Sequence, residues 1–301
     1  MSPPEIVPCL WLDEHAEAAA SLYREAFADV EVDAVARYPE SGPNPADRPP
    51  GSVMTIGLRL TGQPVTLLNG GPQFRPNPSV SFHVIVGDAG EVDALHALLS
   101  DGGAELMPLD AYPWSSRYTW IVDRFGVSWQ LFAQPDVPAI RIVPCLMFAG
   151  VHHGRAREAI DDYVAAIPES RVDEIATFAE GEGGEVGTVK QGAFTLAGAP
   201  LVAMDGGRSH DFGFDEGASL QVLCSDQAEI DRLWDALGDG GEPGPCGWIR
   251  DRFGLWWQVV PARMSGWMAS DDADARARLF AAMLSMGKLD VDRLQRAFLA
   301  D

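Results

Sequence analysis

The sequence predicts an α+β protein made of two tandem halves, and three observations predict it. The segment Ile6–Leu10 returns 136 residues later as Ile142–Leu146. Farther along, Ile121–Gly126 returns 128 residues later as Ile249–Gly254. Matching blocks in one order indicate duplication. Each half also contains more strand-like runs than helices, in the order βαβββ twice. A doubly wound parallel sheet would instead need a helix between nearly all strands.

The first unit is predicted to contain a strand, a helix and three strands, at residues 5–12, 16–27, 30–38, 53–60 and 64–68. The first strand is a short apolar run. Apolar residues at helical spacing predict the helix, and Asp13 is a suitable N-cap for it. The last two strands flank the turn sequence Thr61–Gln63, which predicts a hairpin.

The second unit begins with a strand at 80–86 and a helix at 90–99, which Gly102 and Gly103 end. Two strands at 118–123 and 127–132 then flank an Arg-Phe-Gly turn, and a further strand of this unit is left unplaced. The second half repeats this order, and helices at 271–285 and 291–299 follow it. We therefore expect domains at 1–137, 138–263 and 264–301, with a proline-bearing linker before the second.

Charge and composition exclude several classes of protein. Acidic residues number 44 and basic residues 22, for a net charge of -22. Residues 1–137 carry 18 acids and 7 bases, and residues 138–301 carry 26 and 15, so each part has a net charge of -11. This argues against a nucleic-acid or membrane-surface partner. The four cysteines form no CxxC pair, and no signal peptide or membrane span is evident, so a cytoplasmic protein is expected.

Several longer motifs carry a family resemblance. They are Pro8–Trp11, Gly51–Met54, Asn69–Pro72, Cys246–Pro261 and Met286–Leu294. Together they resemble the PhnB-like branch of the vicinal oxygen chelate superfamily, the glyoxalase and bleomycin-resistance fold. The resemblance implies that each pair of βαβββ units curls a sheet around a ligand-binding cup. Single-copy relatives commonly dimerise, and this chain looks like a fused pair. Whether units pair within or between halves stays open, as does formation of a homodimer.

The name of this branch sometimes refers to a ubiquinone methyltransferase, and the sequence does not support that activity. An adenosyl-type methyl donor usually sits on a glycine-rich turn between a strand and a helix. The glycine cluster Gly181–Gly187 precedes a predicted strand. A hairpin-type loop is therefore the expected structure.

The resemblance also implies four metal-ligand positions in each cup, filled by His or Glu in metal-dependent relatives. The matching residues here are Pro8, Val65, His83 and Gln130 in the first half and Pro144, Leu201, Gln221 and Gln258 in the second. One imidazole and one amide, or two amides, make a poor site for a divalent ion. We therefore expect no metal and no other cofactor.

Polar and aromatic residues remain as candidates for ligand binding. His83 could bind a ligand or act as a catalytic base, or it could be a buried histidine satisfied by the backbone. If Trp129 and Trp257 pack under the helices, the adjacent glutamines point into the cups. The proposed ligand-binding residues are Asn69, Trp120, Gln130, Gln221, Trp248 and Gln258. The repeated Asp-Arg-Phe-Gly segments are expected to form hairpins, with an exposed Asp–Arg ion pair in each.

These residues favour a protein that binds a small, partly aromatic metabolite or drug without a metal. The alternative is a metal-dependent or His-dependent lyase, isomerase or dioxygenase, so whether the protein is an enzyme stays open. We expect function in the first cup, around His83, Gln130, Asn69 and Trp120.

Overall fold

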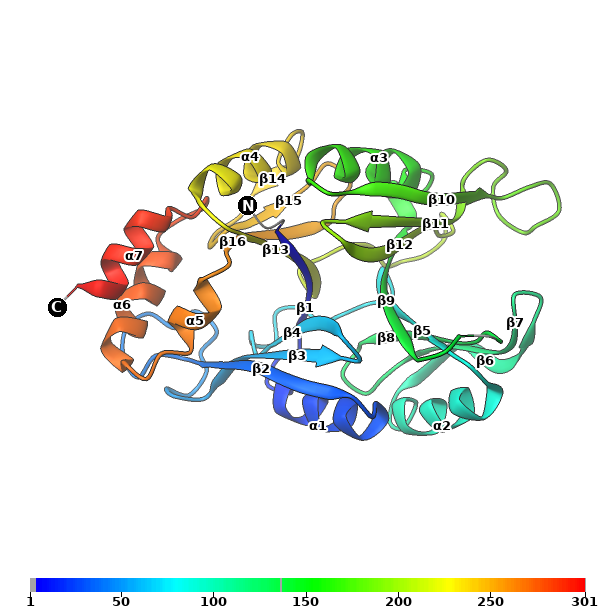
Figure 1. Cartoon of the computed structure of the whole chain (residues 1–301), viewed down its shortest axis with the longest axis horizontal. Helices are drawn as coiled ribbons and strands as arrows, with labels where there is room; N and C mark the ends of the chain where they lie inside the picture. The colour runs from blue at the N-terminus through cyan, green and yellow to red at the C-terminus, as the bar shows by residue number, and fades with distance from the viewer. Residues whose placement is uncertain (1–3, 136, 301) are drawn as a thin grey trace.

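The computed structural model describes residues 4–135 and 137–300, and two eight-stranded mixed sheets form its frame (Figure 1). The first half contains β1 (Glu5–Trp11), α1 (Ala16–Ala26), β2 (Val30–Arg37), β3 (Val53–Leu60), β4 (Gln63–Leu68), β5 (Val80–Val86), α2 (Ala89–Leu99), β6 (Ala104–Tyr112), β7 (Ser115–Val122) and β8 (Ser128–Ala133). This order, βαβββ twice, confirms the α+β prediction.

The second half repeats the order and is followed by a helical extension. It contains β9 (Arg141–Phe148), a 3-10 turn (Gly150–His152), α3 (Ala156–Ala166), β10 (Arg171–Thr177), β11 (Val189–Leu196), β12 (Ala199–Asp205), β13 (Ala218–Cys224), α4 (Gln227–Leu237), β14 (Glu242–Pro243), β15 (Trp248–Arg250) and β16 (Trp256–Pro261). The extension contains α5 (Met264–Met268), α6 (Ala273–Leu284) and α7 (Val291–Leu299). No helix in the described residues is long and apolar enough to cross a membrane.

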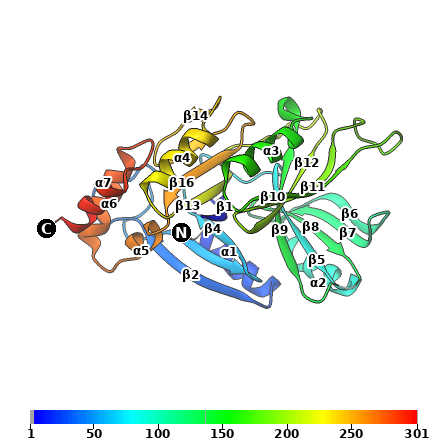
Figure 2. The same ribbon diagram turned by 45° about the horizontal axis from the view of Figure 1, so that its top comes forward.

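The two sheets are built by exchange between the halves, which answers the question that the sequence left open. The first unit of the chain joins the last in the order β14-β15-β16-β13-β1-β4-β3-β2, called here the terminal-unit sheet. The two middle units form the order β10-β11-β12-β9-β5-β8-β7-β6, called the middle-unit sheet. The joins are the antiparallel pairs β1–β13 and β5–β9. Each sheet curves around a concave face, and we call these faces the terminal cup and the middle cup (Figures 1 and 2).

Helices pack on the convex sides of the sheets and hold the two units of each half together. In Figure 1, α1 and α2 lie side by side below the sheets, and α3 and α4 lie above them. Trp129 is fully buried against Tyr23, Phe27 and Phe82, with ring centroids 5.1–5.6 Å apart. Aromatic side chains of this size bury large apolar areas, so this cluster is a major part of the core.

The Asp of each Asp-Arg-Phe-Gly hairpin is buried, so the predicted exposed Asp–Arg pair is wrong. Asp123 is 3% exposed and accepts hydrogen bonds from the Tyr23 hydroxyl at 2.9 Å and the Trp129 indole N–H at 3.0 Å. The backbone N–H groups of Phe125 and Val127 donate to its other oxygen. Asp251 repeats this arrangement in the second half. The carboxylate thus closes the hairpin and ties it to the first helix of its half.

The N-terminus of α1 is capped by a residue distant in sequence. Asp13 lies outside the helix at a positive φ of 54°, and His15 takes the N-cap position without a side-chain cap. The Asn69 Oδ1 atom instead accepts a hydrogen bond from the Ala16 N–H at 2.8 Å. Asp13 was therefore wrongly predicted as the cap, because tertiary structure supplies the acceptor.

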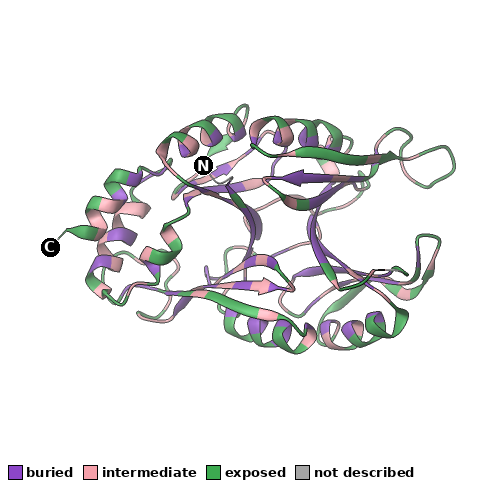
Figure 3. Cartoon of the chain, viewed as in Figure 1, coloured by how far each residue is buried: buried purple, intermediate pink, exposed green. Residues whose placement is uncertain are grey.

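The extension covers the terminal cup. Helices α5–α7 lie across the concave side of the terminal-unit sheet, whereas no helix of the residues that the structure describes lies over the middle cup (Figure 1). Phe280, Leu279 and Leu294 of the extension are buried in one cluster with Tyr38 and Met54 of the sheet region. Parts of the extension's helices are accordingly coloured as buried in Figure 3. Two backbone hydrogen bonds of 2.7 Å hold the extension against the sheet. They run from the N–H groups of residues 246 and 247 to the carbonyls of residues 286 and 287. One cup is thus filled by the chain itself.

Candidate functional site

The side of each strand that faces the middle cup follows from the helix-facing core. Trp129 and Leu131 of β8 are fully buried in the main core under the helices. Because strand side chains alternate, Gln130 and Phe132 point the other way, into the cup. His83 of β5 lies directly beside Gln130 in the parallel register of the two strands. The prediction that the glutamine beside each buried tryptophan faces a cup is therefore supported by the packing.

The other two assumed metal positions in each cup are one residue out of place. Leu201 belongs to the core on the helix side, whereas its neighbour Val202 joins Val143 and Cys145 in a separate cluster inside the middle cup. Cys145 pairs with Val202 on β12, so these two side chains share the cup face. By the same alternation the terminal cup contains Cys9 and Thr66, not Pro8 and Val65. A shift of one residue exchanges the two faces of a strand.

The floor of the middle cup holds a short hydrogen-bond chain. The Tyr118 hydroxyl donates to Gln130 Oε1 at 2.9 Å, and Gln130 Nε2 donates to the Ser81 hydroxyl at 3.0 Å. Gln130 is therefore held in place by neighbouring strands. All three side chains are buried.

His83 is the exception on this floor. It is 4% exposed, and its Nε2 atom is buried without a hydrogen-bond partner among the described residues. Its ring lies against Phe132, with centroids 4.9 Å apart. Burial lowers the pKa of His83 to about 4, so the imidazole is neutral at pH 7. An unpartnered polar atom of this kind costs about 1–3 kcal/mol, and a ligand could remove that cost.

In the terminal cup the matching polar groups are all paired. Thr66 donates to Gln221 Oε1 at 2.8 Å, Gln221 Nε2 donates to Gln258 Oε1 at 3.1 Å, and Gln258 Nε2 donates to Ser219 at 2.9 Å. Thr66 belongs to the first half and the glutamines to the second, so this network spans the exchanged units. The polar side chains of the terminal cup therefore hydrogen-bond to one another, and the extension covers them.

The predicted group around His83 is only partly assembled. Trp120 pairs with Gln130 in the register of β7 and β8, and its indole N–H donates to Ser128 at 2.8 Å. Asn69 lies at the end of β4 in the terminal-unit sheet, so the expectation that it joins His83 is wrong. Its amide is committed to capping α1 and to Val53 and Glu17. The exchange of units between halves is the physical reason.

Trp248 lies in the terminal-unit sheet beside Trp11 and Trp256, at centroid distances of 6.3 and 6.2 Å. Two aromatic residues that sequence reasoning did not single out, Tyr118 and Phe132, instead contact the middle-cup floor. Phe132 alternates with buried Trp129 and Leu131 on β8, a signal that could have identified it.

The donor atoms of the middle cup do not fit the divalent metal of the metal-dependent relatives. They are one imidazole, one amide held by Tyr118 and Ser81, and the Cys145 thiol. Burial raises the pKa of Cys145 to about 12, which keeps it a protonated, weak ligand. Within residues 4–135 and 137–300, no group of three His, Cys, Asp or Glu side chains is placed to hold a metal.

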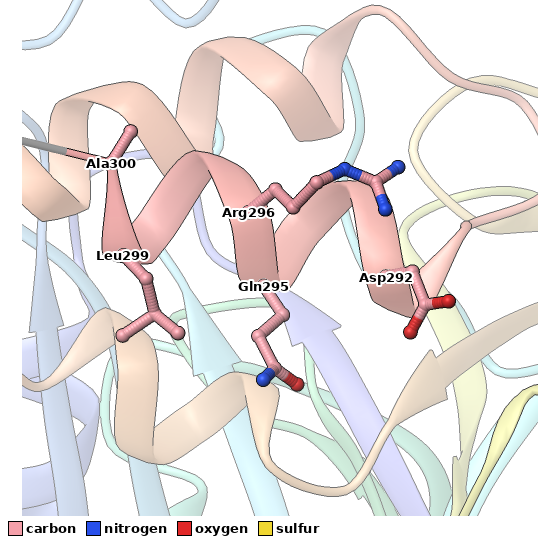
Figure 4. Close-up of a pocket in the computed structure, with 5 residues that line it drawn as sticks. All are labelled: Asp292, Gln295, Arg296, Leu299 and Ala300. Carbon is pink, nitrogen blue, oxygen red and sulfur yellow. The ribbon is translucent and has the colours of Figure 1, made fainter.

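Two surface hollows lie outside the cups. One, of about 320 Å³, is lined by residues along α7, from Asp292 to Leu299, and by Ala300 after it (Figure 4). The other, of about 580 Å³, lies where the hairpin turns near residues 62 and 198 meet the starts of β1 and β9. Neither contains a predicted site residue.

Comparison with known proteins identifies the family. A family model described as 3-demethylubiquinone-9 3-methyltransferase matches residues 4–132 and 140–260. The chain belongs to this family. A PhnB protein from Bacillus cereus, which carries the same methyltransferase name, is 32% identical over 42% of this chain and 98% of its own, with a TM-score of 0.39. Glyoxalase I from Zea mays is 13% identical over 86% of this chain and 93% of its own, with a TM-score of 0.54. A search of curated proteins gave no match.

These similarities confirm a tandem PhnB-like protein of the vicinal oxygen chelate fold. The glycine cluster does not have the position expected of a methyl-donor site, although the family name refers to a methyltransferase. Gly181–Gly187 lies between β10 and β11, so it connects two strands, as the sequence predicts. A methyl-donor turn of the kind described above would lead into a helix.

Proposed function

We propose that the protein binds a small, partly aromatic molecule in the middle cup, without a metal or other cofactor. The observation that carries this proposal is the unpartnered Nε2 atom of His83 on a floor whose matched residues in the terminal cup are fully paired. Buried polar groups in folded proteins nearly always have partners, so one that lacks a partner in an uncapped cup suggests a ligand. The adjacent Phe132 and Trp120 suit an aromatic part of that ligand.

The enzyme alternatives have less support. A metal-dependent reaction would need donors that this cup lacks. A reaction that uses His83 as a general base would need a pKa near the working pH, and a base with a pKa of about 4 is weak at neutral pH. The proposal also includes a cytoplasmic location and no nucleic-acid partner, in keeping with the net charge of -22. A homodimer is compatible with it.

Mass spectrometry of the purified protein under non-denaturing conditions, with elemental analysis, tests this function. We expect a co-purifying organic molecule, lost from the His83→Ala variant and retained by the Gln221→Ala variant, whose change lies in the capped cup. Stoichiometric zinc, iron or manganese bound through His83 would overturn the proposal, as would a ligand lost only with Gln221→Ala.

A further inference from the structure

The aromatic residues near His83 form a continuous series from the surface to the cup floor. Trp114 and Tyr112 at the β6–β7 turn stack with centroids 5.0 Å apart, and Tyr112 lies 5.3 Å from Tyr118. Tyr118 lies 4.8 Å from Phe132, which lies 4.9 Å from His83. We call these five residues the aromatic ladder. It runs from Trp114, 51% exposed, to His83, 4% exposed.

The ladder is specific to the middle cup. The repeat matches Tyr118 with Cys246 and Phe132 with Val260, and Gln221 takes the place of His83. The hairpin that carries Tyr112 and Trp114 is also shortened in the second half, where β14 has two residues. In the terminal cup, Val260 packs against the cluster of the extension and the residue 246 N–H donates to the residue 286 carbonyl. The rings therefore occur only in the cup that the extension leaves uncapped, where a ligand can contact them.

The buried part of the floor beneath the ladder carries no charge. The cup-facing residues of the four central strands are Ser81, His83, Ile85, Ser128, Gln130, Phe132, Val143, Cys145, Met147, Val202 and Met204, with exposed Arg141 and Pro200 at the outer ends of β9 and β12. Burial keeps Cys145 and His83 in their neutral forms at pH 7. A charged group brought to this floor would lose its water without gaining a counter-charge, which is strongly unfavourable.

From this arrangement we infer the class of ligand, and the inference rests on the proposed function of the middle cup. We propose that the cup selects an uncharged, elongated, planar aromatic molecule with one hydrogen-bonding group at its buried end. That group pairs with His83 Nε2, and the rings lie along Phe132, Tyr118 and the exposed end of the ladder. Offset or edge-to-face ring contacts at centroid distances of about 4.5–7 Å are favourable, so the ladder sets both the shape and the orientation of the ligand.

The test uses three naphthalene probes that differ in charge, titrated by calorimetry at pH 7. They are 2-naphthol, which is neutral, 2-naphthoate, which is an anion, and 2-(aminomethyl)naphthalene, which is a cation. We expect 2-naphthol to bind at least tenfold more tightly than either charged probe. The His83→Ala variant should weaken 2-naphthol binding about tenfold, whereas His96→Ala, on α2 outside the cup, should not change it.

A second comparison tests the length of the ligand without risk to the fold. Trp114 is half-exposed, so Trp114→Ala should leave the protein folded. We expect that variant to weaken binding of 6-phenyl-2-naphthol at least threefold and to leave 2-naphthol unchanged, since only the longer probe reaches the rim. Equal effects on both probes would overturn the proposed orientation.

The outcomes separate this inference from the proposed function. If a charged probe binds as tightly as 2-naphthol and His83→Ala still weakens it, the ligand class is wrong and the cup remains the binding site. If no probe binds, the ligand class is overturned, and the co-purification experiment decides the function. If all probes bind and neither His83→Ala nor Phe132→Ala matters, both proposals are wrong.

Discussion

Protonation of His83 should destabilise the folded protein as the pH falls. The ordinary pKa of histidine is 6.5, and burial lowers that of His83 to about 4. Between these two pKa values the unfolded chain binds a proton that the folded state does not bind. The free energy of unfolding is therefore undiminished by His83 above pH 6.5 and falls progressively between pH 6.5 and pH 4. Each pKa unit corresponds to about 1.4 kcal/mol, so the loss should be about 2 kcal/mol at pH 5 and about 3 kcal/mol at pH 4.

Substitution by glutamine isolates this effect, because glutamine occupies the matching position in the second half and does not titrate. We would measure urea unfolding of the wild type and His83→Gln at pH 7.5 and pH 5, followed by tryptophan fluorescence. The wild type should lose about 2 kcal/mol more than the variant between these pH values. Tyr118 and Cys145 share the cup face with His83, and burial raises the pKa of each, so neither changes charge in this range. Parallel pH profiles for the two proteins would refute the reasoning.

Three further predictions concern the site, the core and the extension. His83→Ala should weaken ligand binding by about 1–3 kcal/mol and Gln221→Ala by much less, as measured by calorimetry; the reverse order would contradict assignment to the middle cup. Tyr163→Phe should lower the free energy of unfolding by about 1–3 kcal/mol, because its 2.6 Å hydrogen bond to buried Asp251 is lost, and an unchanged urea midpoint would argue against that role. Phe280→Ala should cost about 3–5 kcal/mol, since this ring is 4% exposed within the capped cup, and a loss below 1 kcal/mol would mean that the extension is loosely attached.

Sequence patterns predicted most elements correctly because their periodicities are local. The strand β6 was not located, since it is largely exposed, contains Pro108 and pairs irregularly with β7. The short helix α5 has five residues, too few for a clear period. Elements with one regular buried face were thus easier to predict than exposed or short ones.

The site was harder to predict for two physical reasons. The strand containing Pro8 is buried on both faces and reads as a continuous apolar run, so alternation cannot show which side chains face the cup. Which units share a sheet depends on pairs far apart in the chain, such as Glu5 with Leu223 and Val80 with Leu146, which no local pattern encodes. Asn69 was therefore assigned to the wrong sheet, whereas His83 and Gln130, on adjacent strands of one unit, were correctly placed together.

The exchange of units across the linker has a consequence for how such a protein can diversify. Two identical chains that paired through the same strands would have two identical cups, because symmetry gives every residue and every tail to both. In a single fused chain the C-terminal helices occur once, and they reach only the sheet that the last unit helps to build. Fusion therefore allows one cup to be closed permanently by its own chain while the other stays uncapped. Because the two halves are covalently linked, a substitution in one cup does not have to suit the other, as it would in a symmetric dimer.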